Sequence, residues 1–190
     1  MSFDESGWWG TCGNTFHEEQ KQIAYATRMG LRPNWAVAHP PVFDLEGRSV
    51  IDIGGGPVSL LLKCVNRGRS IVADPGGFPE WVTERYGACG IEYWRTEGES
   101  DTLTGYSLDE AWIYNVLQHV TDPKVVVANA RGLADTIRIF EWIEIAPYDG
   151  HPHLLTELAL NEWLGGKGFT ANLNESGAVG RAYYGVFRTA

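Results

Sequence analysis

Three consecutive glycines directly after a short apolar strand constrain the fold of this chain more than any other feature. The segment reads Ile51-Asp52-Ile53-Gly54-Gly55-Gly56-Pro57, with β-branched residues leading into it. Glycines, which have no Cβ atom, let the chain turn sharply and let a ligand approach the backbone amides. Proline suits the first position of a helix. The pattern therefore predicts a strand, a tight turn and then a helix over residues 58–65.

Strand and helix signals alternate through the rest of the chain. The other predicted strands cover residues 70–74, 91–95, 110–115, 136–145, 169–173 and 182–188, and the other helices cover 79–86, a segment from 123, and 156–164. This alternation predicts an α/β fold: a mostly parallel sheet, covered on both faces, with right-handed crossovers. The turn at 174–177 predicts that the last two strands form an antiparallel pair. Ligands of such sheets bind at the carboxyl ends of the strands, where the strand order reverses.

A helical segment precedes this region. Thr15 and Glu18 form a capping-box pattern, which predicts a helix from Thr15 to about Met29, closed by Gly30.

The prolines of His39-Pro40-Pro41 forbid a continuing helix. We therefore predict an N-terminal helical extension, residues 1–41, and a main domain, residues 42–190. The extension also contains Trp8 and Trp9, for which two interpretations stay open. They cover an edge of the core, or they form part of a lid over a ligand site, to which His17 and Tyr25 could also contribute.

Charge and composition narrow the classes of partner. The chain of 190 residues has 15 Lys and Arg against 24 Asp and Glu, a formal charge of -9. Nucleic-acid binding depends on neutralising phosphates, so an acidic domain with scattered basic residues disfavours it. No apolar run approaches the ~20 residues of a membrane span, and the acidic start lacks signal-peptide features, which predicts a cytoplasmic protein. The three cysteines lack metal or disulfide spacing, and Cys64 is predicted to be in the core.

An acidic residue at the end of the second strand points to a nucleoside-type ligand. Asp74 lies 18 residues after Gly56, where a carboxylate can accept hydrogen bonds from both hydroxyls of a ribose. A nicotinamide dinucleotide fits less well, because Asp52 would repel its pyrophosphate and little chain is left for a dehydrogenase's substrate domain. No Gly-Lys-Ser/Thr follows the glycines, so the phosphate-binding P-loop is absent.

Three segments, in order, resemble the class I S-adenosylmethionine-dependent methyltransferases. Residues 51–57 resemble the family's motif I, and Val72-Ala73-Asp74 resembles the acidic end of its second strand. Residues 108–123, which include Leu117-Gln118-His119-Val120-Thr121-Asp122-Pro123, are similar to its fourth strand and the segment after it. The resemblance covers about residues 48–190. It implies a Rossmann-like, doubly wound, mostly parallel seven-stranded sheet with an antiparallel C-terminal strand pair, and S-adenosyl-L-methionine as the cofactor.

The resemblance also implies a role for each glycine and acid of the turn. Gly54 and Gly56 would let the backbone approach the methionine part of the cofactor, Asp52 would favour its cationic groups, and Asp74 would hold the ribose hydroxyls. Near the adenine amino group Glu97 is the candidate, with Glu99 second. The predicted cofactor-binding residues are Asp52, Gly54, Gly55, Gly56, Asp74, Pro75, Glu97, Asn115 and Val116.

Two histidines are the candidate catalytic residues. Methyl transfer is an in-line displacement in which positioning supplies much of the acceleration, and a base is needed only if the nucleophile must lose a proton. His119, just past the fourth strand, is the first choice for that base, although it could instead cap or pack against its loop. His151 is the second candidate; a role in the substrate pocket is predicted for His151 or His153, both within Asp149-Gly150-His151-Pro152-His153. Loop histidines of this kind are commoner as polar groups than as ligands, so we predict no metal ion.

The acceptor is left open between a small molecule, which we favour, and a protein side chain. The Asp/Asn-Pro-Pro-Tyr/Phe signature of DNA amino-methyltransferases is replaced here by Asn115-Val116-Leu117-Gln118. The predicted function is therefore a small-molecule methyltransferase. The alternatives are an S-adenosylmethionine-binding protein without methyl transfer, such as a sensor or inactive partner, and an NAD(P)-dependent oxidoreductase. A homodimer through the N-terminal helix also stays open.

Overall fold

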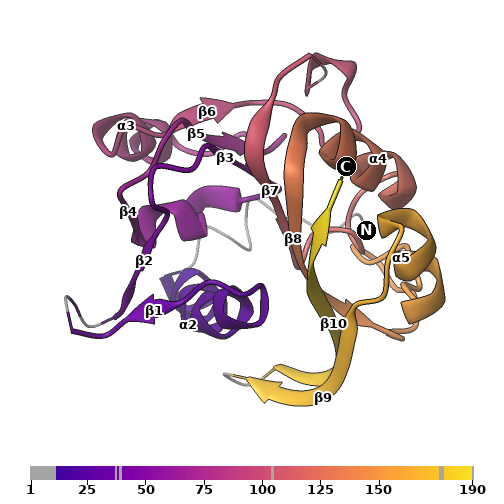
Figure 1. The fold of residues 1–190 in the computed structure, drawn as a ribbon. Helices are drawn as coiled ribbons and strands as arrows, with labels where there is room; N and C mark the ends of the chain where they lie inside the picture. Colours follow the sequence, from indigo (N-terminus) through magenta and orange to yellow (C-terminus); the bar gives the residue numbers. More distant parts are fainter. Residues whose placement is uncertain (1–11, 37, 39, 104, 176–177, 190) are drawn as a thin grey trace.

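A seven-stranded sheet with the strand order β6-β5-β3-β7-β8-β10-β9 forms the centre of the molecule (Figure 1). The computed structural model describes residues 12–189 except 37, 39, 104 and 176–177. The strands are β3 (Val50–Ile53), β5 (Ser70–Ala73), β6 (Glu92–Trp94), β7 (Leu108–Tyr114), β8 (Ala134–Ile143), β9 (Phe169–Glu175) and β10 (Ala178–Arg188). The five neighbouring strands β6, β5, β3, β7 and β8 run parallel, and β10 pairs antiparallel with both β8 and β9. The predicted fold class is confirmed.

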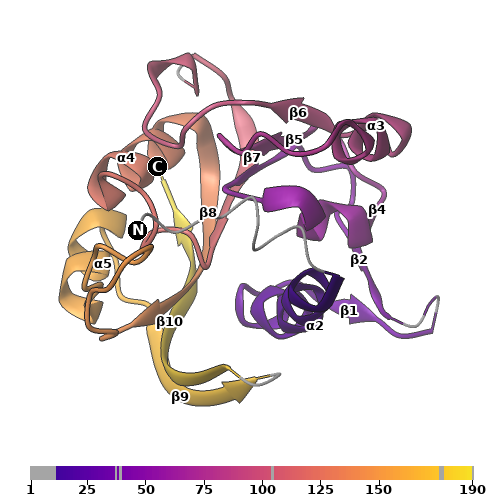
Figure 2. The ribbon, with the colours of Figure 1, turned by 180° about the vertical axis from the view of Figure 1, so that it is seen from behind.

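Helices cover both faces of this sheet (Figures 1 and 2). They are α2 (Cys12–Arg28), α3 (Glu80–Ala88), α4 (Pro123–Leu133) and α5 (Glu157–Leu164). Side chains alternate between the faces of a strand. Accordingly, Ile51 and Ile53 of β3 pack in the core with α4 and α5, whereas Val50 packs in a second core with α2 and α3. None of the described helices is both long and apolar enough to cross a membrane.

The helix predicted over residues 58–65 is absent, and this prediction is wrong. The glycine turn leads instead into two 3₁₀ turns, η1 (Gly56–Val58) and η2 (Leu60–Lys63). Between them Ser59 is extended, with φ -50° and ψ 145°, and its hydroxyl accepts a hydrogen bond from the Leu61 amide. A serine that bonds its local backbone offers the chain an alternative to the helix. The same hydroxyl donates to Asp52, which holds Ser59 in that conformation.

Short strands before and after the two 3₁₀ turns form a second, smaller sheet. Its strands are β1 (Pro33–Asn34), β2 (Val42–Asp44) and β4 (Cys64–Val65), in the order β1-β2-β4. Strand β4 follows η2 directly and pairs parallel with β2. Cys64 is buried there, as predicted.

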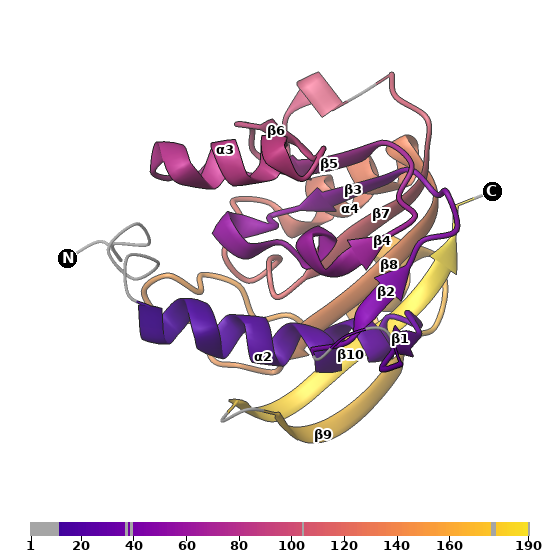
Figure 3. The same cartoon turned by 90° about the vertical axis from the view of Figure 1, so that its left-hand side faces the viewer.

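Helix α2 packs on the main sheet beside η1 and η2 (Figure 3). It begins at Cys12, three residues before the predicted N-cap Thr15, whose side chain lies outside the described part of the chain. The Gln22 amide donates to the Val58 carbonyl at 2.6 Å, and the Arg138 guanidinium donates to the Met29 carbonyl at 2.7 Å. These contacts hold the C-terminal half of α2 against the rest of the chain. The division of the chain at residue 41 stays a prediction, and Trp8 and Trp9 lie outside the described residues.

Candidate functional site

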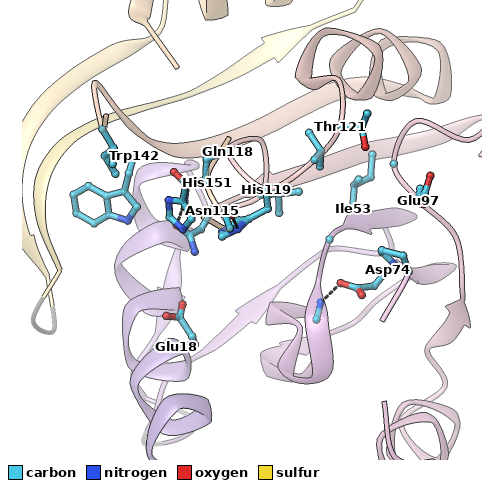
Figure 4. A pocket seen from close by; sticks show the side chains of 18 of the residues that line it. Glu18, Ile53, Asp74, Glu97, Asn115, Gln118, His119, Thr121, Trp142 and His151 are labelled. Carbon is cyan, nitrogen blue, oxygen red and sulfur yellow. Dashed lines mark hydrogen bonds between the residues drawn. The ribbon is translucent and has the colours of Figure 1, made fainter. Parts of the chain in front are cut away.

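A cavity of about 550 Å³ opens at the carboxyl ends of the parallel strands (Figure 4). We call the part formed after β3, β5 and β6 the glycine side; it comprises Ile53, Gly54, Gly56, Asp74, Pro75, Glu97, Gly98 and Glu99. We call the opposite part the helix side; it comprises Glu18, Lys21, Trp142, Ile145, Tyr148, Asp149, Gly150, His151, Ala178 and Val179. The segment after β7 lies between them and contributes Asn115, Val116, Gln118, His119, Val120 and Thr121.

The glycine turn lies against the segment that follows β7. Gly54 has a φ of +72°, a conformation that L side chains rarely adopt, and its amide donates to the Ala73 carbonyl at 2.7 Å. A Cβ atom at this position would lie 2.6 Å from a methyl carbon of Val116. The two predicted site residues Gly54 and Val116 are therefore in contact. Any side chain at position 54 would collide with Val116.

Asp74 lines the cavity and closes the turn from the next strand. Its two carboxylate oxygens accept hydrogen bonds from the Gly56 amide at 2.9 Å and from the Gly76 amide at 2.8 Å. The first of these bonds is drawn in Figure 4. An ionised carboxylate has about four acceptor sites. The same group can therefore hold its own turn and accept further hydrogen bonds from hydroxyls in the cavity.

Asp52 and Gly55 do not line the cavity. The Asp52 carboxyl is fully buried beneath the turn and accepts hydrogen bonds from the Ser59 and Tyr114 hydroxyls, each at 2.5 Å. A Cβ atom on Gly55 would lie 2.7 Å from this carboxyl. Burial raises the pKa of Asp52 to about 7. Asp52 thus supports the turn from below, and its predicted effect on a cationic ligand would have to act through the turn.

The two glutamates after β6 have different positions. One oxygen of Glu99 accepts hydrogen bonds from the Thr121 amide at 2.7 Å and the Asp122 amide at 3.1 Å, just before α4. Glu97 also lines the cavity, without such a bond among the described residues (Figure 4). The arrangement favours Glu97 over Glu99 as the group that contacts a ligand.

Asn115 begins the segment between the two sides in a left-handed conformation, with a φ of +57°. Asparagine is one of the few residues other than glycine that tolerates this region. Its backbone amide donates to the Phe140 carbonyl at 2.8 Å, and its side-chain oxygen accepts from the side-chain amide of Gln118 at 2.9 Å. Strained backbone of this kind is common where a ligand is bound.

Glu141 supports this segment from below and was not predicted from the sequence. One of its carboxyl oxygens accepts hydrogen bonds from the Val116 amide at 3.0 Å and the Leu117 amide at 3.1 Å. The group is fully buried on β8, and burial raises its pKa to about 8. A single acid within the otherwise apolar run from Ile139 to Ile143 was the available signal.

The two predicted catalytic histidines lie against each other in the cavity. Nδ1 of His119 is 2.7 Å from the Gly150 carbonyl oxygen, and because a carbonyl only accepts, Nδ1 carries the proton and Nε2 is the basic nitrogen. The ring centroids of His119 and His151 are 4.2 Å apart, and the two rings are nearly perpendicular. The ring of Tyr148 stacks on that of His151, with 4.3 Å between the centroids. Burial, with a smaller effect of His119, lowers the pKa of His151 to about 4, so its ring is neutral at pH 7.

His153 does not line the cavity. Its Nε2 is 2.7 Å from the Val120 carbonyl oxygen, so it ties the loop before α5 to the segment after β7. Within the described residues, no group of three or more His, Cys, Asp or Glu side chains is placed to hold a metal ion.

The helix side contains residues that the sequence did not single out. Glu18 and Lys21 of α2 form an ion pair at the cavity, one turn apart. Trp142 lines the cavity with its indole nitrogen donating to the Tyr25 hydroxyl at 3.2 Å. Tyr25 itself is buried, 4.1 Å from the ring of Phe140, and does not line the cavity.

Comparisons with known proteins agree with this fold. No protein-family model matches the chain. An uncharacterized methyltransferase from Mycobacterium sp. (strain JLS) is 31% identical over 126 residues, which are 63% of this chain and 47% of that protein. The chain thus spans about half the length of this curated relative.

Several solved structures share the fold at low sequence identity. Magnesium protoporphyrin IX methyltransferase from Synechocystis PCC 6803, with bound S-adenosylhomocysteine, is 14% identical, with a TM-score of 0.62 over 94% of this chain and 88% of that one. The 1,6-didemethyltoxoflavin-N1-methyltransferase of Burkholderia thailandensis, with its substrate and S-adenosylhomocysteine, is 17% identical, with a TM-score of 0.56 over 75% and 71% of the two chains. This chain therefore has the fold of the class I S-adenosylmethionine-dependent methyltransferases, and the resemblance found in its motifs is confirmed.

Proposed function

We propose that this protein is an S-adenosylmethionine-dependent methyltransferase that acts on a small-molecule acceptor. One observation carries the proposal: the Gly54 turn, the Asp74 carboxylate and the left-handed Asn115 meet at one cavity on the carboxyl edge of the sheet. Open α/β sheets bind nucleotide-like ligands at this edge. The cavity volume of about 550 Å³ also falls in the usual range for small-ligand sites.

The residues of the glycine side fit the cofactor. Gly54 and Gly56 line the cavity with positive φ angles and carry no side chain, which lets a ligand approach their backbone. Asp74 would accept hydrogen bonds from the ribose hydroxyls, and Glu97 would accept one from the adenine amino group. Asn115 and Val116 would line the sulfonium end, beside Gly54. S-adenosylmethionine, when bound, supplies a methyl group on a positively charged sulfur, which a nucleophile can attack.

His119 is suited to remove a proton from the acceptor. Its Nδ1–H donates to the Gly150 carbonyl, which fixes the ring orientation and makes Nε2 the proton acceptor. His151 packs nearly perpendicular to this ring, and because it stays neutral at pH 7 it adds no positive charge that would oppose protonation of His119. We assign His119 as the general base and His151 as its neighbour in the acceptor region.

A small-molecule acceptor is supported by the charge of the chain and by the neighbouring structures. A formal charge of -9 disfavours nucleic acid. Two of the solved structures with this fold are enzymes named for small heterocyclic or macrocyclic substrates, 1,6-didemethyltoxoflavin and magnesium protoporphyrin IX.

Calorimetric titration with S-adenosylmethionine and S-adenosylhomocysteine tests the cofactor. We expect micromolar binding that Asp74→Asn weakens by about tenfold, roughly 1.4 kcal/mol, because the carboxylate loses charge while keeping one oxygen acceptor. Asp135→Asn, at the exposed opposite end of β8, is the matched control and should bind as the parent does. Binding of NADH with no binding of either adenosyl ligand would overturn the proposal. Binding without methyl transfer to any acceptor would favour a sensor or inactive partner.

A further inference from the structure

We infer that the helix side of the cavity is an acceptor subsite that takes an uncharged aromatic molecule and rejects anions. This inference rests on the proposed function, because it assumes that the glycine side holds the cofactor. It concerns residues on α2, β8, β10 and the loop after β8, none of which belongs to the glycine turn or to the acidic strand ends.

The wall of the helix side is apolar and aromatic. Trp142, Ile145, Tyr148 and Val179 contribute to it, together with Ala178. Tyr148 is 57% exposed and Val179 is 76% exposed, so both leave apolar surface at the cavity that a ligand can cover. The indole N–H of Trp142 is already donated to Tyr25, so this side chain offers the cavity carbon surface rather than a hydrogen-bond donor.

Aromatic faces make up much of this wall. Tyr148 and His151 stack in nearly parallel planes, 25° apart. The rings of the neighbouring His119 and His151 are nearly perpendicular (Figure 4). Offset stacking and edge-to-face contact are the favoured arrangements for aromatic rings. A planar ring inserted next to this group would extend an arrangement that the protein already uses.

The charges of the helix side leave an anion without a counter-charge. Among its described residues Lys21 is the one that carries a full positive charge, and its ammonium group is paired with the Glu18 carboxylate. Asp149 adds a second carboxylate, and His151 is neutral at pH 7. A carboxylate or phosphate on the acceptor would lose hydration on entry and gain no unpaired cation. An uncharged ring has no such loss.

Matched aromatic probes test this inference on the full chain. The S-adenosylhomocysteine complex is titrated with 2-naphthol and with 2-naphthoate, which share one ring system and differ in charge at pH 7. We expect 2-naphthol to bind at least about tenfold more tightly. Equal or tighter binding of 2-naphthoate would overturn the inference, and so would absence of 2-naphthol binding at about 1 mM when S-adenosylhomocysteine binds. Failure of S-adenosylhomocysteine itself to bind would instead count against the proposed function.

The ion pair on α2 provides the charge test. Glu18→Gln removes the partner of Lys21, so 2-naphthoate should bind several-fold more tightly and the preference for 2-naphthol should shrink. Glu19→Gln is the matched control, because Glu19 is the next residue on α2 and does not line the cavity. It should keep the parent preference. A preference that both variants keep would contradict the assigned role of the Glu18–Lys21 pair.

A second pair of variants tests whether 2-naphthol binds at the helix side. Val179→Glu puts a carboxylate at the apolar wall on an exposed position, where folding is not at risk, and should weaken 2-naphthol binding several-fold. Val186→Glu, on the same strand but outside the cavity, should leave it unchanged. Equal effects of the two substitutions would mean that the probe binds elsewhere.

Discussion

The two sides of the cavity are built in different ways. On the glycine side, Gly54, Gly56 and Asp74 come from neighbouring strand ends close together in the sequence. The Gly56 amide donates to the Asp74 carboxylate, and the Gly54 amide donates to the Ala73 carbonyl next to it. On the helix side, α2, the end of β8 and the start of β10 each contribute side chains, from Glu18 to Val179. A cofactor shared by many enzymes can be held by such a local motif, whereas an acceptor is selected by tertiary contacts that vary between them.

The largest effect is expected at the ion pair that anchors the helix side. The buried Glu110 carboxylate accepts two hydrogen bonds from Arg138, at 2.7 and 2.8 Å, and Arg138 in turn holds the Met29 carbonyl just after α2. Glu110→Ala leaves a buried guanidinium without its partner, which costs about 3–5 kcal/mol of unfolding free energy. Urea denaturation measures this.

The matched control is Glu92→Ala. This substitution removes a bidentate ion pair between Glu92 and Arg69, whose two side chains are each about half exposed. Solvent screens that pair, so its loss should be much smaller. Equal losses in the two variants would show that α2 does not depend on the buried anchor.

The next largest effect concerns the glycine side alone. Gly54→Ala forces a Cβ atom to 2.6 Å from a Val116 methyl carbon in a left-handed conformation. We expect S-adenosylhomocysteine affinity to fall by about 2 kcal/mol, roughly thirtyfold, because the turn and the segment after β7 must separate. Gly90→Ala has a similar positive φ of +68° and no atom within 4 Å of its added Cβ, so it shares the strain without the collision. Comparable losses of affinity in both would contradict the tight-contact argument.

Glu141 lies on β8, but its carboxyl supports the segment after β7, where we propose that the cofactor binds. Substitutions of Glu141 therefore test whether the two sides of the cavity are independent. Glu141→Leu leaves the buried Val116 and Leu117 amides without an acceptor, at a cost of about 1–3 kcal/mol. Glu141→Gln keeps one oxygen acceptor and should lose much less. S-adenosylhomocysteine affinity, measured beside thermal stability, should fall in the leucine variant. Unchanged affinity there would mean that the segment holds its position without Glu141.

The same residue predicts a pH dependence. The pKa of Glu141 is raised from its usual 4.5 to about 8 by burial, so the folded protein keeps a proton that the unfolded chain releases. The unfolding free energy contributed by this proton is fully present below about pH 4.5 and is lost as the pH rises towards 8. Glu141→Gln cannot ionise, so its stability should fall less over that range. Parallel pH profiles for the two proteins would refute this assignment.

The comparison also explains what could be predicted from the sequence. Gly54 and Asp74 were found because the conformations they need are set by neighbours in the chain. The helix predicted over 58–65 was wrong because Ser59 finds a partner in Asp52, a contact that periodicity does not reveal. Glu141 and the Glu18–Lys21 pair were missed because their positions depend on how distant elements pack.

The smallest effect is expected at the choice between Glu97 and Glu99. Glu97→Ala should weaken S-adenosylhomocysteine binding about fivefold, near 1 kcal/mol, because one exposed hydrogen bond is lost. The informative comparison is an analogue with hydrogen in place of the adenine amino group. The parent protein should prefer S-adenosylhomocysteine over this analogue, and Glu97→Ala should bind both equally, since the two changes remove the same contact. Glu99→Ala should keep the preference while losing stability, because Glu99 holds the amides of Thr121 and Asp122. Loss of the preference in the Glu99 variant alone would mean that Glu99, and not Glu97, contacts the adenine amino group.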